Sequence, residues 1–162
     1  MIIPFDMGYV FRPDSNSVDD SQALEALLEL MVLLNRRFLR RYGGTVPSLY
    51  RSGVRYGRTQ EWLPLPMLLR YKVGDCKSLA TARAAELREQ GIPVMMVHRW
   101  LIRRDGGKDF HILLMVKDAG GVPKVFEDPS KVCGMGDDEN AGSGPYFGRD
   151  PGGSFQNYYV AA

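Results

Sequence analysis

The sequence predicts an α+β fold in which helices pack on an antiparallel β-meander. Apolar residues recur every three or four positions over 17–42 and 75–90, which indicates two amphipathic helices. After Pro93 the apolar period changes to two, which indicates strands. The 18 Gly and 10 Pro residues favour a loop-rich chain over a helical bundle. We expect a single domain over residues 1–133, followed by a Gly-rich C-terminal extension over 134–162.

The first helix is expected from Ser17 to Tyr42. Its apolar stripe consists of Leu24, Leu27, Leu28, Met31, Leu34 and Phe38. Ser17 or Asp19 is suited to cap it, and Gly43-Gly44 to stop it. Four arginines in its last turns suit the negative end of the helix dipole, and they also suit an acidic partner.

Residues 45–70 are expected to be irregular, because three prolines interrupt any long element. Tyrosine and tryptophan alternate there with arginine, which is typical of a surface that covers a cleft. Such a stretch can also stack on single-stranded nucleic acid, but the chain has no recognised binding module, so we do not expect a nucleic-acid partner.

The second helix is expected from Asp75, which can cap it, to Gln90, with Gly91 and Pro93 beyond its end. Cys76 then lies in the first turn. It shares a face with Leu79, Ala80, Ala84 and Leu87, so the sulfur is expected to point toward the interior.

Three strands are expected next, at 94–102, 110–116 and 123–127. Short Gly-containing turns separate them, so they predict an antiparallel meander against which the second helix packs. From Gly134 onward the composition is Gly-rich, then aromatic. This is typical of a flexible tail, which its own domain or a neighbouring chain would have to hold.

A thiol at a helix N-terminus is a candidate nucleophile, because the helix dipole and free N–H groups favour the thiolate. The negative charge of Asp75 disfavours the thiolate, and the positive charge of Lys77 partly offsets that effect. An imidazolium would therefore have to contribute most of the stabilisation of the thiolate. His98 and His111 are the two histidines of the chain, and both fall on predicted strands.

Strand alternation favours His111 as the base. Asp128 ends the following strand just before Pro129, where an extended backbone is favoured. Adjacent strands would bring this carboxylate to the imidazole. Glu127, one residue earlier, would point to the opposite face and so not act with Asp128 as a carboxylate pair.

Three motifs resemble the transglutaminase-like (papain-type) family. The stretch VGDCKSLA at 73–80, continuing to GIPV at 91–94, is similar to the cysteine motif of bacterial members. FHILLMV at 110–116 is similar to their histidine strand, and VFEDPS at 125–130 to their Asp-Pro-Ser strand end. Their order and spacing also match. Many relatives have a small residue where this chain has Phe110.

The resemblance implies a papain/transglutaminase-like fold with an additional N-terminal helix. It implies a triad of Cys76 as nucleophile, His111 as general acid and base, and Asp128 as the group that orients the imidazole. The backbone N–H of Cys76 would donate to the oxyanion, with Gln60 or Trp62 as further candidates.

The implied function is hydrolysis or transamidation of peptide, isopeptide or amide bonds in a peptide or protein substrate, through a thioester. If water accepts the acyl group the enzyme is a hydrolase, and if an amine accepts it the enzyme is a transamidase. The sequence does not distinguish between these two reactions. The alternative is a structural or binding component of a larger assembly, such as a bacteriophage particle, with neighbouring chains contacted through the C-terminal extension.

No cofactor is expected, and no metal, because a His-based zinc site lacks the further ligands it needs. The two cysteines and the lack of a recognisable export signal predict a reducing compartment. The expected location is the cytoplasm, or the virion if the protein is phage-encoded. The sequence has no apolar run long enough to cross a membrane, so no membrane contact is expected. Cys133 is expected to be a passive thiol or a redox partner of Cys76. The net charge of +2 indicates no polyanionic partner.

Overall fold

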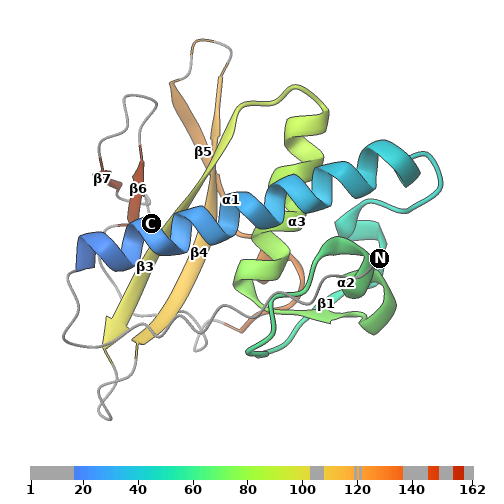
Figure 1. Cartoon of the computed structure of the whole chain (residues 1–162), viewed down its shortest axis with the longest axis horizontal. Coiled ribbons are helices and arrows are strands. Elements are labelled where there is room, and N and C mark those ends of the chain that lie inside the picture. The colour runs from blue at the N-terminus through green and yellow to red at the C-terminus, as the bar shows by residue number, and fades with distance from the viewer. Residues whose placement is uncertain are drawn as a thin grey trace.

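The computed structural model describes residues 17–102, 108–118, 120, 122–136, 146–149 and 155–158. The helices in these ranges are α1 (Ser17–Tyr42), the 3₁₀ helix η1 (Leu49–Arg51), α2 (Leu65–Tyr71), α3 (Cys76–Glu89) and α4 (Pro129–Val132). The strands are β1 (Arg55–Tyr56), β2 (Val73–Gly74), β3 (Val94–Ile102), β4 (Lys108–Lys117), β5 (Pro123–Glu127), β6 (Tyr146–Arg149) and β7 (Phe155–Tyr158). The α+β class is confirmed (Figure 1).

The described strands form a sheet in the order β5-β4-β3-β6-β7 and a small parallel pair, β1 and β2. Within the sheet, β3 pairs with β4 and β4 with β5, both antiparallel. The predicted meander is therefore confirmed, and β5 has the bounds that the sequence predicted.

Helices α1 and α3 cover one face of the sheet, and α1 crosses in front of it in Figure 1. The core on this face joins side chains from both helices and from β3 and β4: Leu24, Leu28, Val32, Ala80, Ala84, Leu87, Val94, Met96, Ile112 and Leu114. Strand alternation places Val97, Leu113 and Met115 in a separate cluster on the other face.

A third cluster packs η1, α2 and α4 against the far side of α3, through Leu49, Leu65, Leu68, Leu79, Ala82 and Cys133. Helix α2 lies in the stretch that was expected to be irregular. Pro64 is its N-cap and Pro66 lies in its first turn, where a missing N–H breaks no helical hydrogen bond. The prolines therefore begin this helix instead of preventing it.

The sequence predicted a C-terminal extension, but two segments of it are strands that join the sheet. Strand β6 pairs with β3 through His98 and Phe147, and β7 pairs with β6. Gly148 makes this possible, because a Cβ there would lie 2.7 Å from Met95 Cε and 2.8 Å from Val97 Cγ1. A side chain at this position would force Met95 or Val97 to shift, so glycine favours the close approach between strands, whereas composition alone predicted a flexible tail.

Among the helices of the described residues, none combines the length and apolar character needed to cross a bilayer.

Candidate active site

Cys76 is the first residue of α3, as predicted. Asp75 is the N-cap and has an extended backbone, and its Oδ1 accepts a hydrogen bond from the backbone N–H of Ser78 at 3.2 Å. This is the usual way in which an aspartate satisfies a free N–H at a helix start. The cap fixes where the helix begins, and so it fixes the position of the sulfur.

His111 and Asp128 are in direct contact. Nε2 of His111 lies 2.8 Å from Oδ2 of Asp128, and the imidazole is buried. The other carboxylate oxygen of Asp128 accepts from the backbone N–H groups of Ser130 at 3.0 Å and Lys131 at 3.3 Å, because Asp128 is also the N-cap of α4. Asp128 therefore presents one oxygen to the histidine and is held by the other.

The sulfur of Cys76 lies beside the backbone of His111. Its thiol donates to the carbonyl oxygen of Phe110 at 3.6 Å, and the backbone N–H of Ile112 hydrogen-bonds the sulfur. These two groups belong to the residues on either side of His111. The structure thus places the sulfur beside the backbone of His111, whose imidazole contacts Asp128 just after the end of β5.

The Cys76 thiol is neutral in this environment. Burial raises its pKa to about 12, and the charge of Asp75 raises it further, while Lys77 and the backbone hydrogen bonds act in the opposite direction. The helix N-terminus that the sequence offered as an activating feature is outweighed by loss of solvent. A reactive thiolate therefore requires that a base take the proton.

Lys77 joins the start of α3 to the loop before it. Its ammonium group pairs with Asp75, donates to the carbonyl oxygen of Thr59 at 3.0 Å, and lies 5.7 Å from the centre of the Trp62 ring. Burial is the largest cause that raises the pKa of Asp75, and Lys77 opposes it. This contact holds the loop of residues 57–64 against the site.

The two oxyanion candidates differ in position. Trp62 is half-buried and packs against the same core as Cys76 and Phe110. Gln60 is exposed to solvent. The role of either side chain stays a prediction.

His98 is on the helix-covered face, away from His111. It is buried, its Nε2 hydrogen-bonds the hydroxyl of Ser21 on α1 at 3.2 Å, and burial lowers its pKa to about 4. Of the two histidines, His111 is the one that lies beside Cys76.

Sequence reasoning missed a polar network behind the site. Arg83 on α3 pairs with Glu127 at 2.7 Å and with Glu86 at 3.0 Å. Glu127 also accepts a hydrogen bond from the hydroxyl of Tyr50, and Glu86 from the backbone N–H of Leu49 at 2.6 Å. As predicted, Glu127 points away from Asp128. The spacing of Arg83 and Glu86 on one helix was the only signal, since the other partners are distant in the sequence.

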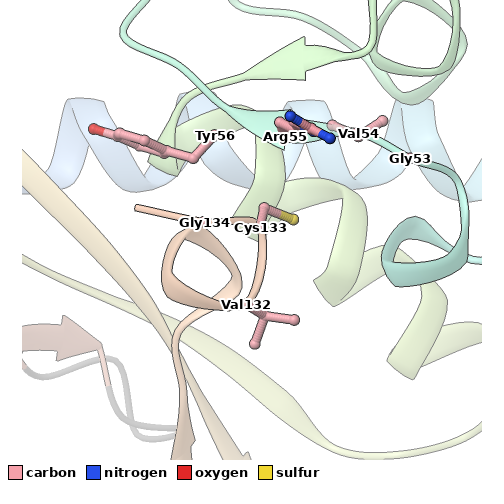
Figure 2. Close-up of a pocket in the computed structure, with 7 residues that line it drawn as sticks. All are labelled: Gly53, Val54, Arg55, Tyr56, Val132, Cys133 and Gly134. Carbon is pink, nitrogen blue, oxygen red and sulfur yellow. The ribbon is translucent and has the colours of Figure 1, made fainter. Parts of the chain in front are cut away.

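A separate pocket lies near α4. It has a volume of about 460 Å³ and is lined by Gly53, Val54, Arg55, Tyr56, Val132, Cys133 and Gly134. Figure 2 shows residues 53–56 on one side of it and the end of α4 on the other. Cys76, His111 and Asp128 are not among its lining residues, so it is distinct from the candidate site. Cys133 is a free, buried thiol whose pKa is raised by burial.

Within the described ranges, no group of three or more His, Cys, Asp or Glu residues is arranged to hold a metal ion. No protein-family model matches the chain, and neither a curated protein nor a solved structure matches it.

Proposed function

We propose that the protein is a thiol hydrolase or transamidase that acts on peptide, isopeptide or amide bonds through Cys76, His111 and Asp128. The observation that carries the proposal is the 2.8 Å contact between His111 and Asp128, beside a cysteine that begins a helix. A nucleophile, a base and a group that orients the base are the parts that acyl transfer requires.

The papain/transglutaminase-like fold belongs to the same proposal. It is supported by the order of elements: a helix that begins with Cys76, a strand with His111, and a strand that ends at Asp128. It is also supported by the antiparallel pairing of β3, β4 and β5.

In the proposed mechanism, His111 takes the thiol proton when substrate is bound. Its Nε2 is engaged by Asp128, so proton transfer with the sulfur is assigned to Nδ1. The thiolate attacks the carbonyl carbon, and the oxyanion is stabilised by the backbone N–H of Cys76 together with Trp62 or Gln60. The imidazolium then protonates the leaving amine, and a thioester remains on Cys76. Water or a primary amine attacks the thioester, giving an acid or a new amide and restoring the thiol.

The test is labelling by iodoacetamide at pH 7, with mass spectrometry to assign the site. Cys133 is an internal control, because its thiol is buried and its pKa, like that of Cys76, is raised. We expect Cys76 to react much faster than Cys133, and the change His111→Ala to remove the difference. Equal, slow labelling of both thiols would end the proposal. Asp128→Asn should decrease the labelling rate of Cys76 less than His111→Ala does. The Asp128→Asn variant keeps the base and impairs only its orientation.

A second candidate is a structural or binding component of a larger assembly, such as a phage particle, built on the same fold. The observation that favours it is that the thiol of Cys76 donates to the carbonyl oxygen of Phe110 at 3.6 Å and its pKa is raised by burial, as for a protonated structural thiol. Under this alternative His111→Ala leaves the labelling rate of Cys76 unchanged, and the protein co-assembles with other particle proteins. The cytoplasm is the proposed location for the enzyme, and the virion for the assembly component.

A further inference from the structure

The contact between His111 and Asp128 lies beyond the paired part of β4 and β5. Among the described residues, the pairing of these two strands ends at Leu114 and Glu127, so Asp128 is the first residue after it. His111 stays within the sheet, because it pairs with Arg99 on β3. The sheet therefore fixes the backbone of the histidine, whereas the carboxylate is fixed by the residues on either side of it.

Glu127, the residue before Asp128, anchors the end of β5 to α3 and η1. Its Oε1 accepts a hydrogen bond from Nε of Arg83 at 2.7 Å and another from the hydroxyl of Tyr50. Burial raises the pKa of Tyr50, so the hydroxyl stays protonated and can donate. Because consecutive Cα atoms are only about 3.8 Å apart, contacts that hold Glu127 also limit the movement of Asp128.

Arg83 is itself held by several partners. Its Nη1 pairs with Glu86, one turn further along α3, at 3.0 Å, and its guanidinium group lies 4.9 Å from the centre of the Tyr50 ring. Glu86 in turn accepts a hydrogen bond from the backbone N–H of Leu49 at 2.6 Å. Partners on both sides leave the guanidinium group little freedom, so α3 determines where Glu127 lies.

Arg83 and Cys76 lie on the same face of α3. Arg83 follows Cys76 by seven residues, which is close to two helical turns and about 10 Å along the axis. At the start of the helix the sulfur contacts the carbonyl oxygen of Phe110 on β4, and two turns later the guanidinium group contacts Glu127 at the end of β5. One helix thus sets the place of the nucleophile and, through Glu127, that of the carboxylate.

We propose that Arg83 is a positioning residue for the proposed reaction and acts through Glu127. By fixing the end of β5, this pair keeps Asp128 in the orientation in which it binds His111. The inference rests on the proposed function, because the histidine has to be oriented to take the proton from the thiol. A misplacement of about 1 Å can slow an enzymatic step about a hundredfold, so a residue that does not touch substrate can still control the rate.

The Nε2 proton of His111 is a direct probe of the contact with Asp128. An ionised carboxylate only accepts, so the proton lies on the imidazole nitrogen, and the hydrogen bond moves its NMR signal downfield and slows its exchange with water. The chain has one other histidine, His98, and the variant His98→Gln assigns the signal. We expect Arg83→Met to shift or remove the His111 signal as Asp128→Asn does. Arg83→Lys keeps a cation and should restore part of it.

Arg88→Met is the matched control. Arg88 lies on the same helix, its side chain is 22% exposed against 19% for Arg83, and it also makes an ion pair, but with Glu29 on α1. Both changes should lower stability, whereas only Arg83→Met should alter the His111 signal. Equal effects of the two variants on this signal would show a general destabilisation and would refute a positioning role.

Glu127→Ala removes the same link from its other end, while Arg83 keeps its contact with Glu86. It should alter the His111 signal as Arg83→Met does, and circular dichroism should show each variant folded. A wild-type signal in Glu127→Ala would overturn the proposal even if Arg83→Met does not fold.

Labelling by iodoacetamide gives the second readout and separates this role from the proposed function. Cys76 should react about tenfold more slowly in Arg83→Met and Glu127→Ala, and at the wild-type rate in Arg88→Met. A wild-type Cys76 that labels as slowly as Cys133 would refute the proposed function, and with it this role. Fast labelling of the wild type, together with an unchanged His111 signal in Arg83→Met, would refute the positioning role alone.

Discussion

Arg83 holds two carboxylates from different parts of the chain, so its removal provides a quantitative test of the network behind the candidate site. In Arg83→Met the side chain keeps much of its length, but Glu86 and Glu127 lose their shared cation. The Glu86 side chain is only 6% exposed. Breaking a buried ion pair on one side costs about 3–5 kcal/mol, because a charge stays buried without its partner.

The expected loss for Arg83→Met is at the lower end of that range. The side chains of Arg83 and Glu127 are 19% and 22% exposed, so solvent replaces part of the lost interaction. We expect a decrease of about 3 kcal/mol in the free energy of unfolding. The matched control is Arg40→Met. Arg40 is 62% exposed, and Glu89 keeps its contact with Arg36 at 2.6 Å, so Arg40→Met should lower the free energy of unfolding far less than Arg83→Met does.

Urea denaturation of both variants measures the two losses side by side. A decrease below about 1 kcal/mol for Arg83→Met, or equal decreases for the two variants, would refute the view that this network supports the fold. Adding Glu127→Gln to Arg83→Met should recover part of the stability, because it removes one of the two stranded charges. If the double variant is no more stable than Arg83→Met, the unpaired carboxylate of Glu127 does not contribute to the loss.

Three further predictions address single contacts. Asp75→Asn keeps a helix cap and removes the charge that raises the pKa of Cys76, so iodoacetamide should label Cys76 several-fold faster; an unchanged or slower rate contradicts this. Burial lowers the pKa of His98 from 6.5 to about 4, so its contribution to stability is complete above pH 6.5 and is lost as the pH falls toward 4, by up to about 3 kcal/mol. His98→Gln should flatten this part of the stability profile, and an unchanged slope in urea denaturation would show that other groups cause it. Gly148→Ala should cost about 1–3 kcal/mol, since its Cβ would meet two side chains within 2.8 Å, whereas Gly44→Ala has open space; similar melting temperatures for the two variants would disprove the close packing.

The elements with a strong local signal could be predicted from the sequence. The end of α1 follows from its leucine spacing and from Gly43-Gly44, and the bounds of β5 follow from the turn before Pro123 and from Pro129 after it. The contact between His111 and Asp128 was predictable for a related reason. Two adjacent antiparallel strands with a short turn allow few registers, so residues near their ends must lie close together.

The remaining features depend on residues that are distant in the sequence. Strands β6 and β7 lie in a Gly-rich stretch, and their place in the sheet is set by pairing with β3, which no local pattern reveals. Helix α2 was missed because its prolines were interpreted as breakers, although their position in the first turn is favourable. For Cys76, the sequence predicted both the helix dipole that favours the thiolate and the interior position of the sulfur, but not that loss of solvent would outweigh the dipole.

The raised pKa of Cys76 also constrains how the proposed enzyme would work. A thiol with a pKa of about 12 is almost entirely protonated at neutral pH, so a preformed thiolate cannot be its resting state. The thiol donates to the carbonyl of Phe110, and that contact must be given up before the proton moves to His111. Substrate that displaces this hydrogen bond would therefore activate the nucleophile as it binds. Proton transfer and attack would then be coupled, as they are for a serine nucleophile. In this mechanism a small alkylating reagent underestimates the reactivity of Cys76 toward a peptide substrate, so the effect of His111→Ala should be larger on substrate turnover than on labelling.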